Sequence, residues 1–386
     1  MNKKVAIWGV GNWGRRAIIE LSQYYCIDYL IDSAVLETTE MYGHKVVPKD
    51  YFFNDVEKPF LFVAISNFED VEKELRDRKI RAYQLYYPSM ESFYSKDVLV
   101  YNTYDYREEI KTENDIQKQN NEKNKRWIDA RVWLYNDIGG LKKPSFIEIE
   151  TYNRCNGICD FCPVNAKSDP RAEMKMTDEL FHKIIDQLSE MDYSGRLSLF
   201  SNNEPFLDER IIDFQRYARK KLPNAYLHLF TNGTKLDIRK FEEIIDNLDE
   251  LIIDNYNQEL RLIPNCKRIV EYCSNKPNLI SKVTIVMRNP REVLTTRGGE
   301  APNRSEKKEV TGVKCTNPFA QMVIRPDGKV SLCCNDPLGK MTLGDLRYES
   351  IIDVWNGEKF GEIRKKINIG RERISHCRYC DVFNVL

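Results

Sequence analysis

The sequence predicts an α/β protein with an N-terminal α/β domain, a partial, TIM-like (β/α)6 barrel and a small cysteine-rich C-terminal domain. Three observations support this. A strand, a glycine-rich turn and a helix open the chain, short apolar segments alternate with helical ones over residues 145–290, and several cysteines fall at ligand-like spacings. We expect the parts to be 1–98, a linker and helix over 99–140, 141–310 and 311–386.

The composition excludes several classes of protein. Lys plus Arg and Asp plus Glu both total 59, so no net field favours nucleic acid or an anionic membrane. No apolar run is long enough to span a bilayer, and the first residues lead into glycines rather than into the apolar core of a signal peptide. We expect a soluble, cytoplasmic protein, in which seven or eight of the eleven cysteines are clustered or ligand-spaced and indicate metal binding rather than disulfides. Cys26, Cys266 and Cys273 stand apart and are expected to be small buried hydrophobes.

The first element is a buried strand over residues 4–8, and a helix extends to about residue 24. Between them lies the turn G-V-G-N-W-G, with glycines at Gly9, Gly11 and Gly14. The next apolar segment, 27–31, ends at Asp32. Strand, G-x-G-x-x-G turn, helix, strand and acid follow the order of a dinucleotide-binding βαβ unit.

A further strand over 59–66 and a helix over 69–78 complete a Rossmann-like domain. The segment 5–48 resembles Rossmann-like modules attached to sugar-modifying enzymes such as sugar methyltransferases and acyltransferases. Two hypotheses remain open for it. Its glycines and Asp32 bind a nucleotide or nucleotide-sugar, or the domain serves packing and assembly.

The stretch 112–126 contains a single apolar side chain, Ile116, so we predict a linker or a solvated helix there. Apolar residues return over 127–135. We expect this segment to pack as a helix on the domain that follows it.

The barrel prediction rests on alternating segments, because parallel strands with covering helices give this pattern. The loops after such strands hold the functional residues. We predict strands near 146–150, 196–201, 226–230, 250–254 and 282–287, and helices near 177–191, 208–220, 238–247 and 258–273.

Three cysteines lie in the loop after the first barrel strand, as Cys155-N-G-I-Cys159-D-F-Cys162. Zinc prefers four ligands in C-x2-C pairs, whereas three thiolates on one loop hold an iron–sulfur cube with one open iron. The spacing C-x3-C-x2-C, with the aromatic Phe161 before the last cysteine, resembles the radical S-adenosylmethionine (SAM) superfamily. The resemblance implies a [4Fe–4S] cluster whose open iron binds SAM, and reduction that cleaves SAM to methionine and a 5′-deoxyadenosyl radical. A flavodoxin- or ferredoxin-like donor is expected to supply the electron.

A second motif follows the next predicted strand, as Ser201-N-Asn203-Glu204-P, where the superfamily usually has G-G-E-P. The resemblance assigns to Glu204 the role of holding the SAM ammonium, with Asn203 beside it. Asparagine tolerates positive φ, so we expect the tight turn to survive the loss of both glycines. The segment 231–234, T-N-G-T, also resembles a superfamily loop.

The C-terminal cysteines form the second cluster of thiols. Cys315, Gly328 and Cys333 match the opening spacing of the SPASM/twitch extension, around a predicted hairpin with a Pro-Asp-Gly turn, and Cys377 and Cys380 complete a set of four. The resemblance implies a second, fully ligated [4Fe–4S] cluster, as in the shorter twitch form of aminocyclitol dehydrogenases. A four-thiolate zinc site and Cys334 in place of Cys333 are the alternatives.

The predicted activity is oxidation of a carbon of a sugar, aminocyclitol or nucleotide-sugar, with the auxiliary cluster accepting an electron. A SPASM-type peptide maturase and a radical SAM epimerase remain alternatives, as does a zinc-stabilised nucleotide-binding assembly protein. The loop 297–304 is long enough to cover the barrel as a substrate or SAM loop, or to be a disordered connection.

Overall fold

The computed structural model describes residues 3–89, 92–94, 97–104, 113–304 and 306–383, so 105–112 of the predicted linker lie outside the described residues. The chain divides into two compact units, one formed by 1–90 and 121–140 and the other by 91–120 and 141–384. In the described part of the chain, no helix is both long and apolar enough to cross a membrane.

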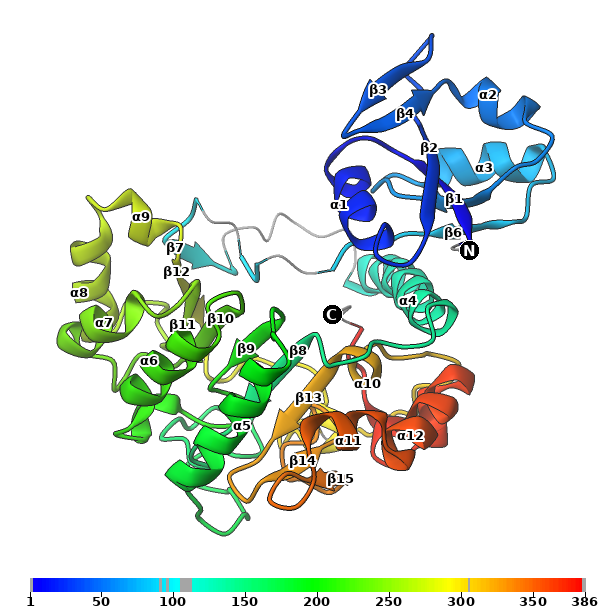
Figure 1. The fold of residues 1–386 in the computed structure, drawn as a ribbon. Helices are drawn as coiled ribbons and strands as arrows, with labels where there is room; N and C mark the ends of the chain where they lie inside the picture. Colours follow the sequence, from blue (N-terminus) through cyan, green and yellow to red (C-terminus); the bar gives the residue numbers. More distant parts are fainter. Residues whose placement is uncertain (1–2, 90–91, 95–96, 105–112, 305, 384–386) are drawn as a thin grey trace. The chain divides into compact units, whose positions relative to one another are not determined.

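The first unit contains a six-stranded sheet in the order β3-β4-β2-β1-β5-β6 (Figure 1). Five strands are parallel, namely β1 (Lys4–Trp8), β2 (Cys26–Ile31), β4 (His44–Val47), β5 (Phe60–Val63) and β6 (Tyr83–Leu85). β3 (Thr39–Met41) is antiparallel to β4. Taken in chain order, the parallel strands are arranged 3-2-1-4-5, the order of a doubly wound nucleotide-binding sheet. The helices are α1 (Asn12–Leu21), α2 (Lys49–Asn54) and α3 (Glu69–Asp77).

Two of the three motif glycines are required by packing. Gly9 has φ +119°, and a Cβ on Gly14 would stand 1.9 Å from the Gly9 carbonyl oxygen. Only glycines let β1 and α1 approach this closely. Gly11 differs, because a Cβ there would meet no atom within 4 Å.

The second half of α4 (Glu113–Asp137) packs on the first unit. The Trp127 ring lies 4.7 Å from that of Phe68 and 5.2 Å from that of Trp13, centroid to centroid. Arg131, which is buried, donates to Glu20 Oε1 at 2.8 Å. The prediction that 127–135 packs on the following domain was therefore wrong, because its aromatic and charged partners belong to the preceding one.

The second unit is built on a nine-stranded sheet in the order β15-β14-β13-β8-β9-β10-β11-β12-β7. Its predicted strands are β8 (Phe146–Ile149), β9 (Arg196–Ser198), β10 (Tyr226–Thr231), β11 (Glu250–Tyr256) and β12 (Val283–Arg288), all parallel. β7 (Val100–Asn102) adds a parallel edge strand that the sequence did not predict. The α/β prediction is confirmed, and the described strands form an open sheet rather than a closed barrel.

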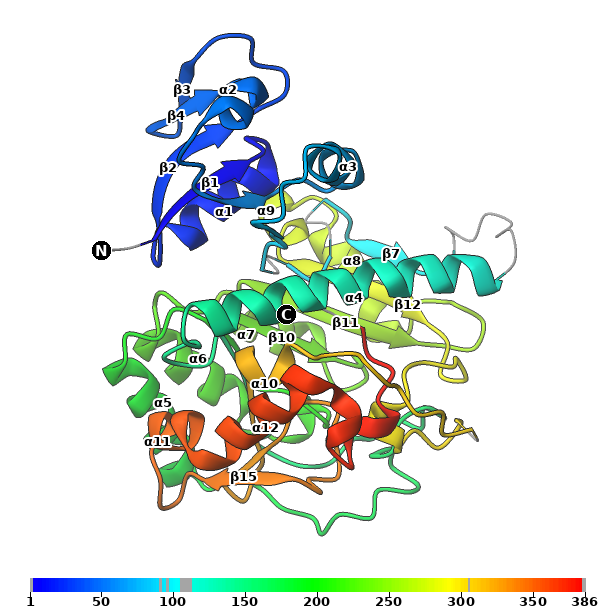
Figure 2. The same cartoon turned by 90° about the vertical axis from the view of Figure 1, so that its right-hand side faces the viewer.

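The C-terminal region extends this same sheet. β13 (Gln321–Ile324) pairs in parallel with β8, and β14 (Lys329–Ser331) and β15 (Thr342–Asp345) follow in antiparallel order. The hairpin predicted around Pro-Asp-Gly is thus present as β13–β14. In Figure 2, α11 (Ile351–Asn356) and α12 (Glu358–Ile369) lie beside β15.

The helices covering the parallel strands are close to those predicted, as α5 (Asp178–Glu190), α6 (Ile211–Lys221), α7 (Ile238–Ile245) and α8 (Pro264–Cys273). The short helices α9 (Pro277–Ile280) and α10 (Asn317–Ala320) were not predicted. Local chemistry explains some starts, since Thr177 caps α5 through the Leu180 N–H at 3.2 Å and Asp237 caps α7 through that of Lys240 at 2.9 Å.

We expect Gly14→Ala to lower the free energy of unfolding of the first unit by about 2 kcal/mol or more, because its methyl group overlaps the Gly9 carbonyl. Gly11→Ser is the matched control, since serine fits the open space and caps α1, and should change stability by about 0.5 kcal/mol or less. Urea unfolding of the full chain followed by tryptophan fluorescence measures this, because Trp355 alone of the five tryptophans lies outside this unit. Equal stabilities of the two variants would contradict the packing argument.

Candidate functional site

The three-cysteine loop begins just beyond the carboxyl end of β8. Gly157 lies between its first two thiols, and its backbone N–H donates to Cys155 Sγ at 3.3 Å. A Cβ on Gly157 would stand 3.3 Å from Cys155 Sγ and 3.8 Å from Cys159 Sγ. Because glycine has no side chain, there is room beside both sulfurs for a group held between them.

The electrostatics of this loop favour a positively charged occupant. Burial raises the pKa of the Cys155 thiol to about 12, with further increases from Glu204 and Cys162. Burial also raises the pKa of Cys159 to about 12, and the two neighbouring thiols add to the effect. Three neighbouring thiolates repel one another without a cation, so the donor set fits an iron–sulfur cluster.

Glu204 lies in the loop after β9 and is buried. Its carboxylate accepts hydrogen bonds from Thr231 Oγ1 and the Asn232 N–H, each at 2.7 Å, and from the Phe206 N–H at 3.1 Å. Burial raises its pKa to about 7. A carboxylate accepts about four hydrogen bonds, so one acceptor position remains for a ligand.

The two asparagines in place of the usual glycines hold this loop without left-handed backbone. Neither Asn202 nor Asn203 has positive φ, so the expected reason for their tolerance was wrong. Asn203 Oδ1 instead accepts from the Ser201 N–H at 3.1 Å. Its buried Nδ2 has no partner among the described residues.

The T-N-G-T loop after β10 joins the cysteine loop to Glu204. Asn232 Nδ2 donates to Asn156 Oδ1 at 3.0 Å, and Asn156 Nδ2 donates to Thr234 Oγ1 at 2.8 Å. Gly233 has φ +73°, and a Cβ there would lie 2.7 Å from Ile253 Cγ2. Phe161 is buried with its ring 5.9 Å from that of Tyr256 on β11. The structure thus brings together the site residues predicted for the first cluster.

A cavity of about 590 Å³ opens next to this loop, lined in part by Tyr104, Arg288 and Glu292. The Asp160 N–H donates to the Pro290 carbonyl at 2.9 Å and fixes the cysteine loop beside it. Its volume is in the range of small-molecule sites.

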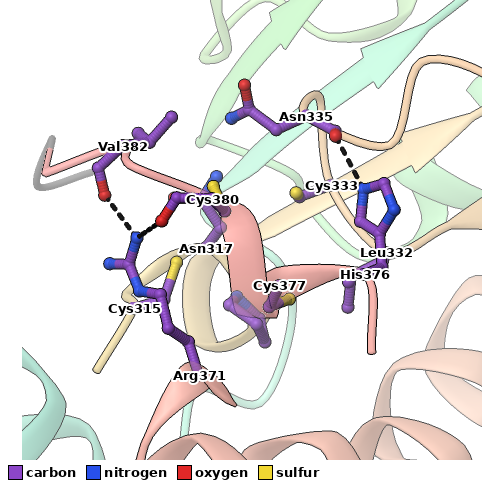
Figure 3. Close-up of a pocket in the computed structure, with 11 residues that line it drawn as sticks. Cys315, Asn317, Leu332, Cys333, Asn335, Arg371, His376, Cys377, Cys380 and Val382 are labelled. Atoms are coloured by element: carbon purple, nitrogen blue, oxygen red, sulfur yellow. Dashed lines mark hydrogen bonds between the residues drawn. The ribbon is translucent and has the colours of Figure 1, made fainter. Parts of the chain in front are cut away.

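The four C-terminal thiols surround a second, small cavity of about 20 Å³ (Figure 3). Cys333 follows β14, and the 3₁₀ turn η4 (Cys377–Tyr379) holds Cys377 and Cys380 through the Cys380 N–H, 3.0 Å from the Cys377 carbonyl. Arg371 and His376 also line the cavity. Within the described residues, no three Cys, His, Asp or Glu side chains are arranged to hold a single metal ion.

Burial raises the pKa of Cys333 well above its usual value, and Cys334, Cys377, Cys315 and Cys380 raise it further. The four thiols that line the cavity therefore lie close enough to repel one another as thiolates. Four thiolates match the ligand count of a [4Fe–4S] cube with a cysteine on each iron, and also that of a four-coordinate zinc ion.

Cys333 and Cys334 face different surroundings. Cys334 is not among the residues lining the thiol cavity. Its N–H donates to Gln321 Oε1 at 3.2 Å, and Gln321 Nε2 donates to Glu148 Oε1 at 2.9 Å. Consecutive cysteines thus belong to neighbouring sites.

Sequence reasoning missed a group that we call the polar cluster, formed by Glu148, Ser201, Asn202, Arg297 and Gln321. Ser201 Oγ donates to Glu148 Oε2 at 2.5 Å, and Arg297 donates to Asn202 Oδ1. Burial raises the pKa of Glu148 to about 7. A signal was present in the sequence, because Glu148 interrupts an otherwise apolar strand just before the cysteine loop.

The loop 297–304, which the sequence left undecided, is ordered where it meets the cysteine-rich region. Gly298 has φ +67°, and a Cβ there would meet His376 Nε2 at 2.4 Å. The preceding Thr296 Oγ1 donates to the Tyr379 carbonyl at 2.6 Å. These contacts help to hold Arg297 in the polar cluster.

The nucleotide site predicted at Gly9, Gly11, Gly14 and Asp32 stays a prediction. Asp32 follows β2, but its Oδ1 accepts from the Ala34 N–H at 2.8 Å in a local turn. Gly11 faces open space before α1, and no side chain caps that helix.

Comparison with known proteins gives two family matches. A radical SAM superfamily model matches residues 149–260, which include Cys155, Cys159, Cys162 and Glu204. A SPASM model, described as an iron–sulfur cluster-binding domain, matches residues 315–381 with all four C-terminal thiols of the cavity. The first compact unit lies outside both matches.

A curated relative and a crystal structure are among the proteins similar to this chain. The relative is an S-adenosyl-L-methionine-dependent 2-deoxy-scyllo-inosamine dehydrogenase of Niallia circulans, 26% identical over 244 residues, which are 62% of this chain and 94% of the relative. The crystal structure is of BtrN in complex with AdoMet and 2-DOIA, with a TM-score of 0.53, 24% identity and coverage of 62% and 93% of the two chains. That likeness shows the fold.

Proposed function

Because the chain carries a radical SAM domain followed by a SPASM domain, we propose that it is a radical SAM dehydrogenase. It oxidises a hydroxyl-bearing carbon of a small polyhydroxylated ring, such as an aminocyclitol, a sugar or a nucleotide-sugar. The radical SAM domain implies SAM and a [4Fe–4S] cluster, and the SPASM domain implies further iron–sulfur binding.

One observation supports oxidation above all. Cys333 lines the four-thiol cavity, while the next residue, Cys334, bonds to Gln321 of the polar cluster. A substrate bound at the polar cluster would be next to Cys334, and the adjacent Cys333 would hold the electron-accepting iron–sulfur cluster. Two-electron oxidation by a radical needs such an acceptor, because hydrogen-atom removal accounts for one electron alone.

The site geometry supports the following assignment of the cofactor residues. Cys155, Cys159 and Cys162 hold the cluster with the open iron, and Glu204 holds the SAM ammonium through its remaining acceptor position. The cavity of about 590 Å³ beside the cysteine loop offers room for the rest of SAM. The thiols at 315, 333, 377 and 380 hold the auxiliary cluster. When bound, SAM and the clusters supply a radical that removes the carbon-bound hydrogen atom and an acceptor for one electron.

The chain's own residues hold the substrate and take up its proton. Glu148 is buried, and its pKa of about 7 suits a general base near neutral pH. Arg297, whose buried Nε has no partner among the described residues, is placed to donate to a hydroxyl oxygen. Transfer of the hydroxyl proton to Glu148 completes conversion of the alcohol to a ketone.

The relative acts on 2-deoxy-scyllo-inosamine, an aminocyclitol, and the polar cluster suits hydroxyl and amino groups of that kind. We further propose a flavodoxin- or ferredoxin-like donor and a reducing, cytoplasmic setting, since all eleven cysteines are free. A nucleotide-sugar at Gly9, Gly11, Gly14 and Asp32 belongs to the same proposal.

The activity test uses reconstituted protein with dithionite, SAM and 2-deoxy-scyllo-inosamine or hexose derivatives as probes. We expect one 5′-deoxyadenosine for each ketone formed, with deuterium from the oxidised carbon appearing in the 5′-deoxyadenosine. Glu148→Gln should lower ketone formation about 100-fold or more, because the base is lost. Absence of SAM cleavage, or an epimer as product, would overturn the proposal.

Iron analysis tests the two cluster assignments. The reconstituted chain should hold about eight irons, and the triple change of Cys155, Cys159 and Cys162 to Ala should leave about four. The Cys333→Ala variant should lose auxiliary iron, while the matched Cys334→Ala variant should keep about eight. Colourless protein with zinc at the C-terminal thiols would contradict the auxiliary cluster.

The affinity for SAM should depend on pH through Glu204. Its carboxyl is charged above a pKa of about 7 and binds an ammonium in that form alone, so affinity should fall about tenfold as pH drops from 8 to 6. Glu204→Gln should bind SAM about tenfold or more weakly and lose this dependence. Titration calorimetry measures both, with the exposed Glu209→Gln as control. Unchanged pH dependence in Glu204→Gln would exclude this role.

A further inference from the structure

Arg371 is a buried cation beside the four-thiol cavity. It opens the 3₁₀ turn η3 (Arg371–Arg373), and it is 1% exposed. Its Nη1 donates to the carbonyls of Cys380 at 2.8 Å and Val382 at 2.7 Å (Figure 3). Its Nη2 donates to the Lys314 carbonyl at 2.6 Å. The guanidinium thus binds the chain next to two of the four cavity cysteines.

All three of these acceptors are neutral carbonyls. Among the described residues, no carboxylate forms an ion pair with Arg371. Arg131 is the other arginine among the buried residues of the described chain, and it pairs with Glu20 at 2.8 Å. A buried guanidinium without a counter-charge is strongly unfavourable, so this position requires an anionic neighbour.

The thiol cavity supplies that anion when its cluster is present. A [4Fe–4S] cube in its oxidised state with four thiolates has a net charge of about −2, and uptake of one electron makes it about −3. A nearby positive charge in a low-dielectric interior stabilises the more negative state to a greater extent. Net charge and burial are among the properties that set the reduction potential of such clusters.

We propose that Arg371 is the counter-charge of the auxiliary cluster and raises its reduction potential, so that the cluster accepts the electron released in substrate oxidation. The inference rests on the proposed function, because it assumes a cluster at Cys315, Cys333, Cys377 and Cys380. Arg371 is a positioning residue, which acts on the substrate through the cluster.

The test isolates the auxiliary cluster in protein whose Cys155, Cys159 and Cys162 are changed to Ala. Redox titration followed by electron paramagnetic resonance gives its midpoint potential without SAM or substrate. We expect Arg371→Gln, which keeps donors but loses the charge, to shift the potential to more negative values. Arg371→Lys, which keeps the charge, should stay near the parent. Arg373→Met in the same turn is the matched control, because Arg373 is exposed, and should cause no shift.

The outcomes separate this inference from the proposed function. If the parent with three alanines holds no iron, the auxiliary cluster itself is absent and the proposed function fails with it. An unchanged potential in iron-loaded Arg371→Gln would overturn the role of Arg371 and leave the proposed function in place. Failure of both Arg371→Lys and Arg371→Gln to hold iron would assign Arg371 to folding and overturn the inference.

Discussion

The pairing of β8 with β13 is the constraint on which the candidate site depends. The two strands lie side by side in parallel, with Gln321 opposite Phe146 and Ile324 opposite Ile149. β8 leads into the three-cysteine loop, and β13 leads through a tight hairpin to Cys333. Because β14 runs antiparallel to β13, Cys333 lies toward the amino end of β13, while the three-cysteine loop follows the carboxyl end of the neighbouring β8. Thiols from segments about 170 residues apart thus belong to adjoining strands of one sheet. The pairing also brings Gln321 to Glu148, which closes the polar cluster.

This arrangement concentrates buried charge. Burial raises the pKa of Glu148, Glu150 and Glu204 to about 7 each. Glu150 is compensated by Arg171 at 3.1 Å, which also pairs with Asp169. The other two carboxylates are held by hydroxyl, amide and backbone donors instead of by close cations. Such groups are unfavourable for stability, so their presence around the cysteine loop indicates a site selected for chemistry.

The parts that local sequence determines were predictable. Strand and helix positions in the barrel region follow from apolar periodicity, and spacing alone marks both cysteine groups. Contacts between distant segments could not be predicted in this way. Nothing local to 127–135 shows that Trp127 meets Trp13 and Phe68, and nothing in the pattern of 321–324 shows that it joins β8. The polar cluster was missed for the same reason, because its members come from four separate segments and meet only in the folded chain.

Cys333 and Cys334 are adjacent in sequence but lie in different surroundings. Adjacent residues in an extended chain point to opposite sides, which led to the expectation that one of the two faces the metal. Although β14 ends at Ser331, the two cysteines do differ, because Cys333 lines the thiol cavity and Cys334 does not, while the Cys334 backbone N–H donates to Gln321. One peptide unit therefore lies between a site suited to an electron acceptor and a site suited to a substrate. Such proximity favours electron transfer in the proposed two-electron oxidation, whereas a structural metal site does not depend on it. The same backbone geometry thus keeps Cys334 out of the thiol cavity and places the polar cluster, where we propose that the substrate binds, beside that cavity.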